Sequence, residues 1–429
     1  MESIVVRGGR PLAGEVTIDG AKNAALPLIA ATLLAAKGVC RLENVPALRD
    51  ISTITRLLSG MGAEIEQREN VLEISTAAVS DCQAPYELVK TMRASILVLG
   101  PLMARFGEAR VSLPGGCAIG ARPVNLHIRG LEQMGAEIKV EHGYIIGRAE
   151  RLKGADISFD LTTVTGTENL MMAAVLAEGT TTLRNAAREP EIVDLAVFLR
   201  KMGARIEGEG SHTITIEGVR KLSAAAHRVM PDRIEAGTFM VAAGISRGDV
   251  VIRNAPLAAL GAVVAKLQEI GLNIEPLAPW SEDEVLSGTP VRIRRRAGGL
   301  RGLDVKTMPF PGFPTDMQAQ VMVLLALAEG SSVISETVFE NRFMHVFELQ
   351  RMGADIEVEG RTAVVRGVPT LSGAPVMASD LRASAGLVLA GLAAEGETVM
   401  SRVYHLDRGY AGFEKKLAAL GADIERVKN

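Results

Sequence analysis

The chain has 429 residues, with 47 basic and 50 acidic side chains and a formal net charge of −3. This length accommodates two or three domains with complete hydrophobic cores, and the balanced charge gives no reason to expect a nucleic acid or a membrane surface as partner. The cysteines, Cys40, Cys82 and Cys117, are odd in number and widely spaced, which is typical of a reducing cytosol rather than of a disulfide framework. We therefore expect a cytoplasmic protein whose partners are small molecules.

The first long apolar run covers residues 24–36. It contains Pro27 and Thr32 and is too short to cross a bilayer, so it predicts a buried helix rather than a leader or an anchor. The six histidines show no paired metal-ligand spacing, and no Cys-x-x-Cys occurs. We therefore expect neither a metal ion nor another cofactor.

A short motif marks the organisation of the rest of the chain. The pattern Met-Gly-Ala-Glu-Ile, or a close variant of it, begins at Met61, Met134, Met202, Ile270, Met352 and Leu420. Each copy ends an amphipathic run and leads into alternating apolar residues, so its glycine is expected to cap a helix that is followed by a strand. This recurrence predicts six copies of one packing unit.

A second, alanine-rich helix is expected before the motif in every copy. The segments are 24–36, 94–104, 170–177, 239–243, 317–328 and 383–394. Most of them end in Glu-Gly or Arg-Gly followed by β-branched residues. The predicted unit is therefore strand, buried helix, strand, exposed helix, strand, strand, which makes the chain an α/β protein built from βαβαββ-type repeats.

The six repeats are expected to group as two domains of three. The first domain is predicted to cover residues 22–230 and to carry Cys117, and the second to cover residues 1–21 and 231–429. The strand predicted at residues 4–7 can pair with either domain. If it pairs with the second one, the chain passes twice between the domains.

Polar residues recur at the expected starts of both kinds of helix. The buried helices begin near Lys22-Asn23, Arg93, Thr167-Glu168, Asp232-Arg233, Asp316 and Asp380-Leu-Arg382, and the exposed ones near Arg49, Arg122 and Arg408, with Arg342 two residues further on in a fourth copy. Cations are unfavourable at a helix N-terminus, so their recurrence there indicates an anionic ligand such as a phosphate or a carboxylate. The alternative is that each one points into solvent or pairs with a nearby aspartate.

The segment at residues 111–123 reads Val-Ser-Leu-Pro-Gly-Gly-Cys-Ala-Ile-Gly-Ala-Arg-Pro. Its prolines and glycines predict a loop, and Arg110 and Arg122 flank Cys117, which favours a reactive thiolate. The alternative is a glycine-rich hairpin whose cysteine is exposed by chance.

Seven stretches together resemble one family over nearly the full chain. They are Gly20-Ala-Lys-Asn-Ala-Ala-Leu-Pro27, Lys90-Thr-Met-Arg-Ala-Ser95, Leu113-Pro-Gly-Gly-Cys-Ala-Ile-Gly-Ala-Arg-Pro123, Phe313-Pro-Thr-Asp-Met-Gln-Ala-Gln320, Glu340-Asn-Arg-Phe-Met-His345, Asp380-Leu-Arg-Ala-Ser384 and Asp407-Arg-Gly-Tyr410. The family is that of the UDP-N-acetylglucosamine 1-carboxyvinyltransferases, within the EPSP synthase superfamily. The resemblance implies an inside-out α/β barrel in each of two domains, with the active site in the cleft between them.

This family transfers the enolpyruvyl group of phosphoenolpyruvate to the 3′-hydroxyl of UDP-N-acetylglucosamine by addition and then elimination of phosphate, and so begins peptidoglycan synthesis. The resemblance implies that Lys22, Arg122 and Arg408 hold phosphoenolpyruvate and that Asp316 accepts the hydroxyl proton. It also implies that Cys117 is the residue alkylated by fosfomycin and acts either as a general acid or in product release. The further substrate contacts that it implies are Asn23, Arg93, Pro123, Val124, Asn125, Leu126, Thr163, Val164, Val338, Arg342, Asp380 and Arg382.

One position departs from the family pattern, because Leu161 stands where some members have a lysine. A nucleotide-phosphate contact from that side chain is therefore not expected. Two other functions stay open at this point. One is that of the related 3-phosphoshikimate 1-carboxyvinyltransferases, against which the Cys117 loop argues, and the other is that of a non-catalytic nucleotide-sugar-binding repeat protein.

Overall fold

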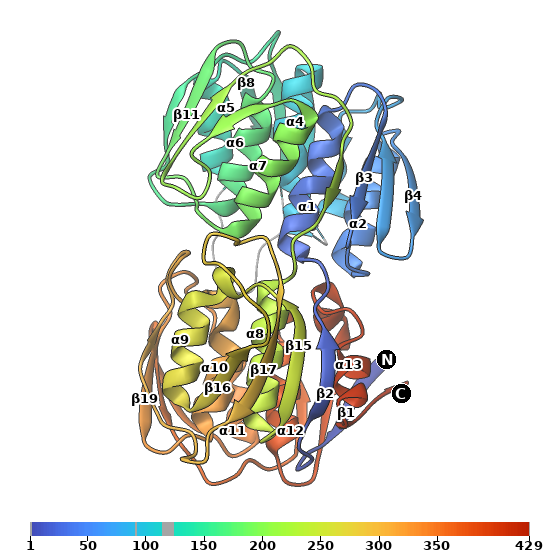
Figure 1. Cartoon of the computed structure of the whole chain (residues 1–429). Helices are drawn as coiled ribbons and strands as arrows, with labels where there is room; N and C mark the ends of the chain where they lie inside the picture. The colour runs from blue at the N-terminus through green and yellow to red at the C-terminus, as the bar shows by residue number, and fades with distance from the viewer. Residues whose placement is uncertain (1, 91, 114–123, 429) are drawn as a thin grey trace. The chain divides into compact units, whose positions relative to one another are not determined.

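A computed structural model describes residues 2–90, 92–113 and 124–428 of the chain. The described residues divide into two compact units (Figure 1). Unit 1 contains residues 2–19 and 231–428, and unit 2 contains residues 20–113 and 124–230. Cys117, Arg122 and Pro123 lie outside the described residues.

One repeat of unit 2 shows the predicted order of elements without interruption. It consists of β10 (Asp156–Ser158), α6 (Val164–Ala174), β11 (Thr180–Arg184), α7 (Pro190–Met202), β12 (Arg205–Glu207) and β13 (Thr213–Glu217). Its strands form a four-stranded sheet in the order β10-β11-β13-β12, in which β10 and β11 are parallel and the other neighbours are antiparallel. The predicted order of strand, helix, strand, helix, strand, strand is thus confirmed.

The other repeats follow the same plan. In unit 2 they contain α1 (Lys22–Ala31), η1 (Thr32–Leu34), β3 (Val39–Glu43), α2 (Arg49–Gly60), β4 (Glu64–Arg68), β5 (Val71–Ser75) and β14 (Ala226–Arg228), and then β6 (Gln83–Ala84), α3 (Tyr86–Val89), η2 (Arg93–Val98), α4 (Leu99–Phe106), β7 (Glu108–Ser112), α5 (Asn125–Gln133), β8 (Glu137–Glu141) and β9 (Tyr144–Arg148). In unit 1 they contain β2 (Ala13–Thr17), α8 (Arg233–Ile245), β15 (Asp249–Ala255), η3 (Leu257–Leu260), α9 (Gly261–Ile270), β16 (Leu272–Pro276) and β17 (Thr289–Arg295), then β18 (Val305–Lys306), η4 (Thr315–Met317), α10 (Gln318–Ala326), β19 (Ser331–Ser335), α11 (Val346–Arg351), β20 (Asp355–Glu359) and β21 (Thr362–Arg366), and finally β22 (Pro375–Met377), α12 (Leu381–Ala393), β23 (Glu397–Ser401), η5 (Val403–Arg408), α13 (Phe413–Ala419), β24 (Asp423–Lys428) and β1 (Glu2–Arg7).

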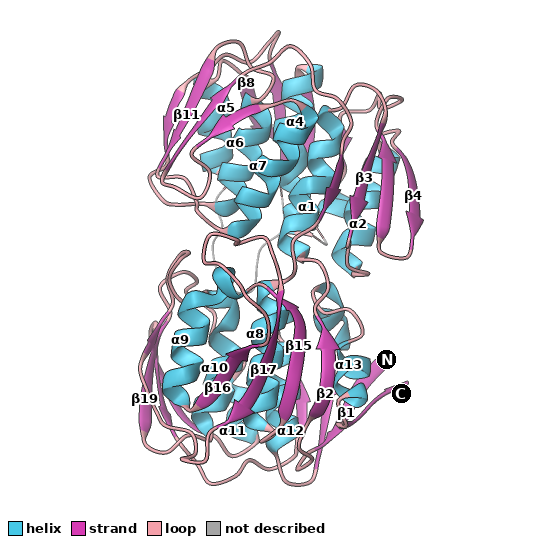
Figure 2. Cartoon of the chain, in the orientation of Figure 1, coloured by secondary structure: helices cyan, strands magenta, loops and turns pink. Residues whose placement is uncertain are grey.

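The two helices of each repeat differ in burial, and this difference gives the units their layers. Every residue of α8 is buried, whereas α9 buries only Val263, Leu267 and Ile270, which lie on one face. A helix that is apolar all round is stable only when other elements surround it. Accordingly α8, α10 and α12 contact one another inside unit 1, and the sheets lie outside them (Figure 2). This is the inside-out arrangement that the resemblance implies.

The glycine of the recurring motif ends a helix in every repeat, as predicted. Its φ angle lies between 88° at Gly135 and 126° at Gly271 in the six copies. A side chain at such an angle is strained, so only glycine turns the chain from helix to strand here without cost.

Three strands complete repeats to which they are distant in sequence. β1 pairs with both β23 and β24 of the last repeat, β2 pairs with β15 of the fourth, and β14 pairs with β3 of the first. The N-terminal strand therefore belongs to unit 1, which answers the question that the sequence left open. The chain passes from unit 1 to unit 2 after residue 19 and returns after residue 230.

Charged side chains of unit 1 hold residues 17–19, where the chain leaves this unit for unit 2. The Lys416 Nζ of α13 donates to the Thr17 carbonyl at 3.2 Å, to Asp19 Oδ2 at 2.9 Å and to Glu235 Oε1 at 2.6 Å. Glu235 Oε2 accepts from the Asp19 backbone N–H at 2.9 Å, and the Asp232 N–H donates to the Asp19 carbonyl. The two crossing segments are thus tied to each other and to α8 and α13 where they leave unit 1.

Two details of the predicted helix starts are wrong. Arg342 and Arg408 do not begin the exposed helices, because α11 starts at Val346 and α13 starts at Phe413. Arg408 instead ends the short helix η5, and Gly409 and Gly412 separate it from α13. No helix in the described ranges is both long and apolar enough to cross a membrane.

Candidate functional site

A paired clamp on Asp316 is the centre of the candidate site in unit 1. Asp316 lies in η4, Arg342 lies in the turn before α11, and Arg382 is the second residue of α12. Asp316 Oδ1 is 2.9 Å from Arg342 Nη2, and Oδ2 is 2.9 Å from Arg382 Nη2. The sequence named these residues separately, and the structure brings all three together.

The two arginines of the clamp are buried, and the surroundings of Arg382 favour its charged form. Their side chains are 5% and 3% exposed, against 25% for the Asp316 side chain. Burial by itself lowers the pKa of Arg382, but the Asp316 carboxylate, together with Tyr410 and Asp232, outweighs burial and raises it. Arg382 Nη1 is buried and has no hydrogen-bond partner within the described ranges, so the clamp keeps a charged donor in addition to the bond with Asp316.

Asp316 is not a helix cap. The N-cap residues of η4 and α10 are Pro314 and Met317, so the carboxylate between them is directed to the arginines rather than to helix N–H groups. Asp380, by contrast, is a cap, because its Oδ1 accepts from the N–H groups of Arg382 at 2.8 Å and of Ala383 at 3.1 Å. Its capping bond fixes the start of α12 and thereby the position of Arg382.

The backbone at Val338 is held by hydrogen bonds to the buried carboxylate of Glu336. Glu336, which is 1% exposed, accepts the N–H groups of Val338 and Phe339 at its Oε1. Its other oxygen accepts from the Thr315 hydroxyl at 2.8 Å, next to Asp316. Glu336 therefore holds the Val338 segment and the start of η4 in one arrangement.

His345 and Arg408 complete the polar side chains of this region. Burial lowers the pKa of His345 to about 4, with the Asp380 carboxylate opposing this effect, so the ring is neutral at physiological pH. Its Nε2 has no hydrogen-bond partner in the described part of the chain. Arg408 is half-buried at the end of η5, and its charge helps to lower the pKa of the neighbouring His405.

In unit 2, Lys22 is the first residue of α1 and is 9% exposed. Its Nζ is 3.6 Å from Oδ2 of Asp50, a buried residue in the first turn of α2. A buried ammonium needs such a counter-charge, since desolvation otherwise favours its neutral form. Asn23 follows it and is half-buried.

The starts of α5 and α6 carry the other predicted contacts of unit 2. Val124, Asn125 and Leu126 form the start of α5, and Thr163 is the N-cap of α6 with its hydroxyl accepting from the Gly166 N–H at 3.2 Å. Val164 is the first residue of α6.

Asn169 links these starts to the short helix that begins with Arg93. Its amide nitrogen lies 2.9 Å from His127 Nδ1 of α5 and 3.2 Å from the Ile96 carbonyl, and its oxygen accepts from the Gly100 N–H at 2.6 Å. Burial, together with the charge of Arg93, lowers the pKa of His127 to about 4. A neutral His127 can accept a hydrogen bond from the Asn169 side-chain N–H. Asn169 therefore joins α5, α6, η2 and α4 at one point.

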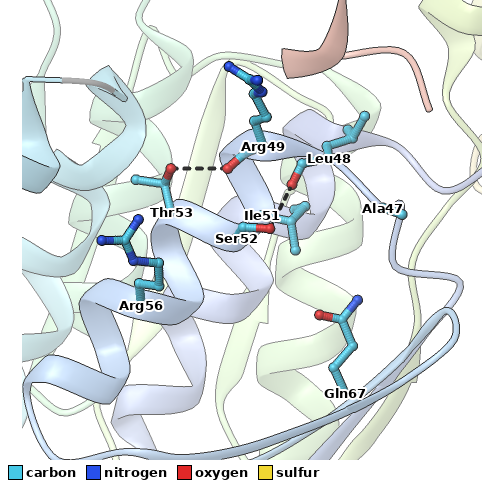
Figure 3. A pocket seen from close by; sticks show the side chains of 8 residues that line it. All are labelled: Ala47, Leu48, Arg49, Ile51, Ser52, Thr53, Arg56 and Gln67. Carbon is cyan, nitrogen blue, oxygen red and sulfur yellow. Dashed lines mark hydrogen bonds between the residues drawn. The ribbon is translucent and has the colours of Figure 1, made fainter. Parts of the chain in front are cut away.

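A hollow of about 480 Å³ lies beside the start of α2, between that helix and β4 (Figure 3). Arg49 and Arg56 extend from the helix, and Gln67 faces them from the strand. The Thr53 hydroxyl donates to the Arg49 carbonyl at 3.0 Å. None of the substrate contacts that the resemblance implies lines this hollow, so the side-chain cluster around Asp316, and not this hollow, is the candidate site.

Sequence reasoning missed Glu336 and Asn169, and also Gln320, whose Nε2 donates to the Asp316 carbonyl at 2.9 Å. The available signal was a polar residue next to an apolar run. Glu336 follows a β-branched run, and Asn169 precedes an alanine-rich one. Among the described residues, no group of His, Cys, Asp and Glu side chains is placed to hold a metal ion.

Comparison with known proteins identifies the family. The family model described as EPSP synthase (3-phosphoshikimate 1-carboxyvinyltransferase) matches residues 6–417. A protein of Geotalea uraniireducens (strain Rf4), named UDP-N-acetylglucosamine 1-carboxyvinyltransferase, is 59% identical over 428 residues and 100% of both chains. The chain belongs to this family. A relative of the same name from Magnetococcus marinus (strain ATCC BAA-1437 / JCM 17883 / MC-1) is 58% identical over 100% of both chains.

Solved structures agree with this assignment. The enolpyruvyl transferase NikO from Streptomyces tendae is 25% identical, with a TM-score of 0.88 over 100% of this chain and 99% of that one. EPSP synthase from Acinetobacter baumannii is 19% identical, with a TM-score of 0.77 over 100% of both chains, and it supports the fold alone. The enolpyruvyl transferase fold, predicted from the resemblance, is thereby confirmed.

Proposed function

We propose that this chain transfers the enolpyruvyl group of phosphoenolpyruvate to the 3′-hydroxyl of UDP-N-acetylglucosamine and releases phosphate. The observation that carries the proposal is the full-length identity of 59% to relatives named for this activity. The clamp of Asp316 by Arg342 and Arg382 supports it, because the reaction needs a carboxylate base beside buried cations.

The described charges suit both substrates, which are polyanions. Lys22 and Arg93 in unit 2, and Arg342, Arg382 and Arg408 in unit 1, provide cations for phosphate and carboxylate groups. Arginine binds such groups with two parallel N–H bonds, and a buried lysine acts as a point charge. We assign the phosphoenolpyruvate contacts to Lys22, Arg122 and Arg408, and the sugar-nucleotide contacts to the remaining predicted residues.

The chemistry follows from where protons move. Asp316 accepts the proton of the 3′-hydroxyl while the hydroxyl oxygen forms a bond to C2 of phosphoenolpyruvate. C3 gains a proton and becomes a methyl group. Loss of that group's proton and of phosphate from the tetrahedral adduct then restores the double bond. Cys117 acts either as the acid toward C3 or in product release, and is the residue that fosfomycin alkylates.

The finer biological assignments belong to the same proposal. The reaction begins peptidoglycan synthesis and so serves cell-wall formation, cell shape and division. The protein acts in the cytoplasm on two small molecules, without a nucleic acid or membrane partner. The same proposal includes a first barrel domain of residues 22–230, which carries Cys117, and a second barrel domain of residues 1–21 and 231–429.

Phosphate release tests the proposal. Purified protein is incubated with phosphoenolpyruvate and either UDP-N-acetylglucosamine or shikimate 3-phosphate. Release with the first acceptor alone is expected. Release with shikimate 3-phosphate alone assigns the related transferase activity, and binding of UDP-N-acetylglucosamine without release identifies a non-catalytic binding protein.

A further inference from the structure

A buried polar cluster lies directly behind the clamp of Asp316. It consists of Thr238 on α8, Gln320 on α10 and Tyr410 after η5, which are 0%, 0% and 2% exposed. The Tyr410 hydroxyl is 2.9 Å from Thr238 Oγ1, and Gln320 Nε2 is 3.1 Å from Thr238 Oγ1 and 3.2 Å from the Tyr410 hydroxyl. Thr238 and Gln320 lie on helices in which every residue is buried and most side chains are apolar.

The hydroxyl of Thr238 sets the direction of its hydrogen bond with Tyr410. The Thr238 hydroxyl donates to the Ile234 carbonyl at 2.7 Å, so its oxygen can only accept from its other neighbours. Tyr410 must therefore donate to Thr238, and the two hydrogens of Gln320 Nε2 are shared among Thr238 Oγ1, the Tyr410 hydroxyl and the Asp316 carbonyl. Burial raises the pKa of Tyr410, which keeps the phenol protonated and able to donate.

Two contacts connect the cluster to the clamp. Gln320 Nε2 donates to the backbone carbonyl of Asp316 at 2.9 Å. The guanidinium of Arg382 lies over the ring of Tyr410, 5.5 Å from its centre, as in a cation–π contact. Tyr410 thus contacts Arg382 directly, and it reaches Asp316 through its hydroxyl and Gln320.

Stability alone gives a poor account of this arrangement. Apolar side chains of the same size would fill such a site with less desolvation cost, and Gln320 Oε1 has no hydrogen-bond partner in the described ranges. A connected polar cluster instead fixes its members in one geometry. A catalytic carboxylate benefits from this, because small displacements lower the rate steeply.

We propose that Tyr410 is a positioning residue that, with Gln320 and Thr238, holds Asp316 and Arg382 in the geometry for proton transfer. This inference rests on the proposed function, in which Asp316 is the base. No contact between Tyr410 and substrate is part of it.

The main test compares Tyr410→Phe with Tyr404→Phe. The first variant keeps the ring under Arg382 and removes the hydroxyl, and the second alters an exposed tyrosine of η5 that the site does not use. We expect kcat to fall roughly tenfold in Tyr410→Phe with KM for both substrates within about twofold of wild type, and no change in Tyr404→Phe. Tyr410→Leu, which also removes the ring, should lose more of kcat. Wild-type kcat in Tyr410→Phe overturns the proposal, whatever its melting temperature.

A second measurement does not depend on activity. The ¹⁵N signal of the Arg382 side chain, assigned by its loss in Arg382→Lys, should shift in Tyr410→Phe and not in Tyr404→Phe. An unchanged signal overturns the positioning role. If the wild-type protein is inactive and the Arg382 signal still shifts in Tyr410→Phe, the proposed function is wrong. The structural link between Tyr410 and Arg382 then still holds.

Discussion

Asp316 and Arg382 are joined across two neighbouring buried helices, with Asp316 Oδ2 2.9 Å from Arg382 Nη2 and the arginine side chain 3% exposed. Arg342 binds the other carboxylate oxygen at the same distance. Two guanidiniums on one carboxylate leave the group of three with a net positive charge. This net positive charge is suited to a site that binds a phosphate.

We predict that Asp316→Asn lowers kcat by roughly 100-fold or more while the affinity for UDP-N-acetylglucosamine changes by less than about tenfold. The amide keeps the size of the side chain but cannot accept the proton. Steady-state kinetics and titration calorimetry measure the two effects, with circular dichroism to establish folding. Asp304→Asn is the control, because Asp304 lies outside the candidate site and its carboxylate accepts from the Val333 N–H. A folded Asp316→Asn enzyme with near wild-type kcat removes Asp316 from the catalytic set.

Arg408→Ala is expected to raise KM for phosphoenolpyruvate at least about tenfold, with a smaller effect on kcat. The guanidinium is proposed to grip this substrate in the ground state and the transition state alike. Arg402→Ala is the matched control, because Arg402 is an exposed residue at the other end of η5. An equal rise of KM in both variants, or none in Arg408→Ala, contradicts the assignment.

Cys40 and Cys82 are expected to react slowly with fosfomycin and other alkylating agents. Burial raises the pKa of the Cys40 thiol, and burial with the charges of Glu108 and Asp81 raises that of Cys82 to about 11. Only a small fraction of either is thiolate at neutral pH. Mass spectrometry after brief alkylation should therefore find the label first on Cys117. Early label on Cys40 or Cys82 contradicts this.

The cluster at Lys416 predicts a pH dependence of stability. Burial raises the pKa of Glu235 to about 7, although the Lys416 ammonium acts in the opposite direction. The folded-state pKa thus lies above the unfolded value of about 4.3, so the stability that Glu235 contributes is complete below about pH 4.3 and is lost as the pH rises through about 7. The pKa of Lys416 is raised from 10.5, so this residue stays charged throughout that window.

Glu235→Gln tests this prediction, because glutamine does not ionise. The free energy of unfolding of wild type relative to the variant should decrease between about pH 5 and about pH 8, as measured by urea denaturation. Glu15→Gln, at an exposed partner of Arg253, serves as the control and should show little pH-dependent difference. A constant difference between wild type and Glu235→Gln over this range would show that Glu235 keeps one protonation state.

The repeat made most of the fold predictable. The marker glycines and the alanine-rich runs each correspond to a physical requirement, namely a left-handed φ or burial on every side, and these requirements are local in sequence. The start of α13 was missed because Gly409 and Gly412 interrupt the helical run after Arg408. The pairing of β1 also had to come from the structure, since either unit offers strands of suitable pattern.

The site was predictable as a set of residue types and not as a geometry. Asp316, Arg342 and Arg382 were recognised from their motifs, but their contact depends on the packing of α10 against α12. Gln320 and Tyr410 lie inside motifs that carry the family resemblance, but the sequence predicted no role for either residue. Their bonds join residues far apart in the chain, which no spacing rule reveals.

The pairing of the N-terminal strand with the C-terminal strands sets the order in which the two units can fold during translation. All strands of unit 2 lie between residues 39 and 228, so this unit has its full set of partners before the rest of the chain is translated. Unit 1 holds the first strand to be synthesised, β1, whose partners β23 and β24 are the last. Until translation ends, β1 is an unpaired edge that can attract other strands. After residue 230, and until the last strands are made, the nascent chain therefore carries a complete unit 2 and an unpaired β1.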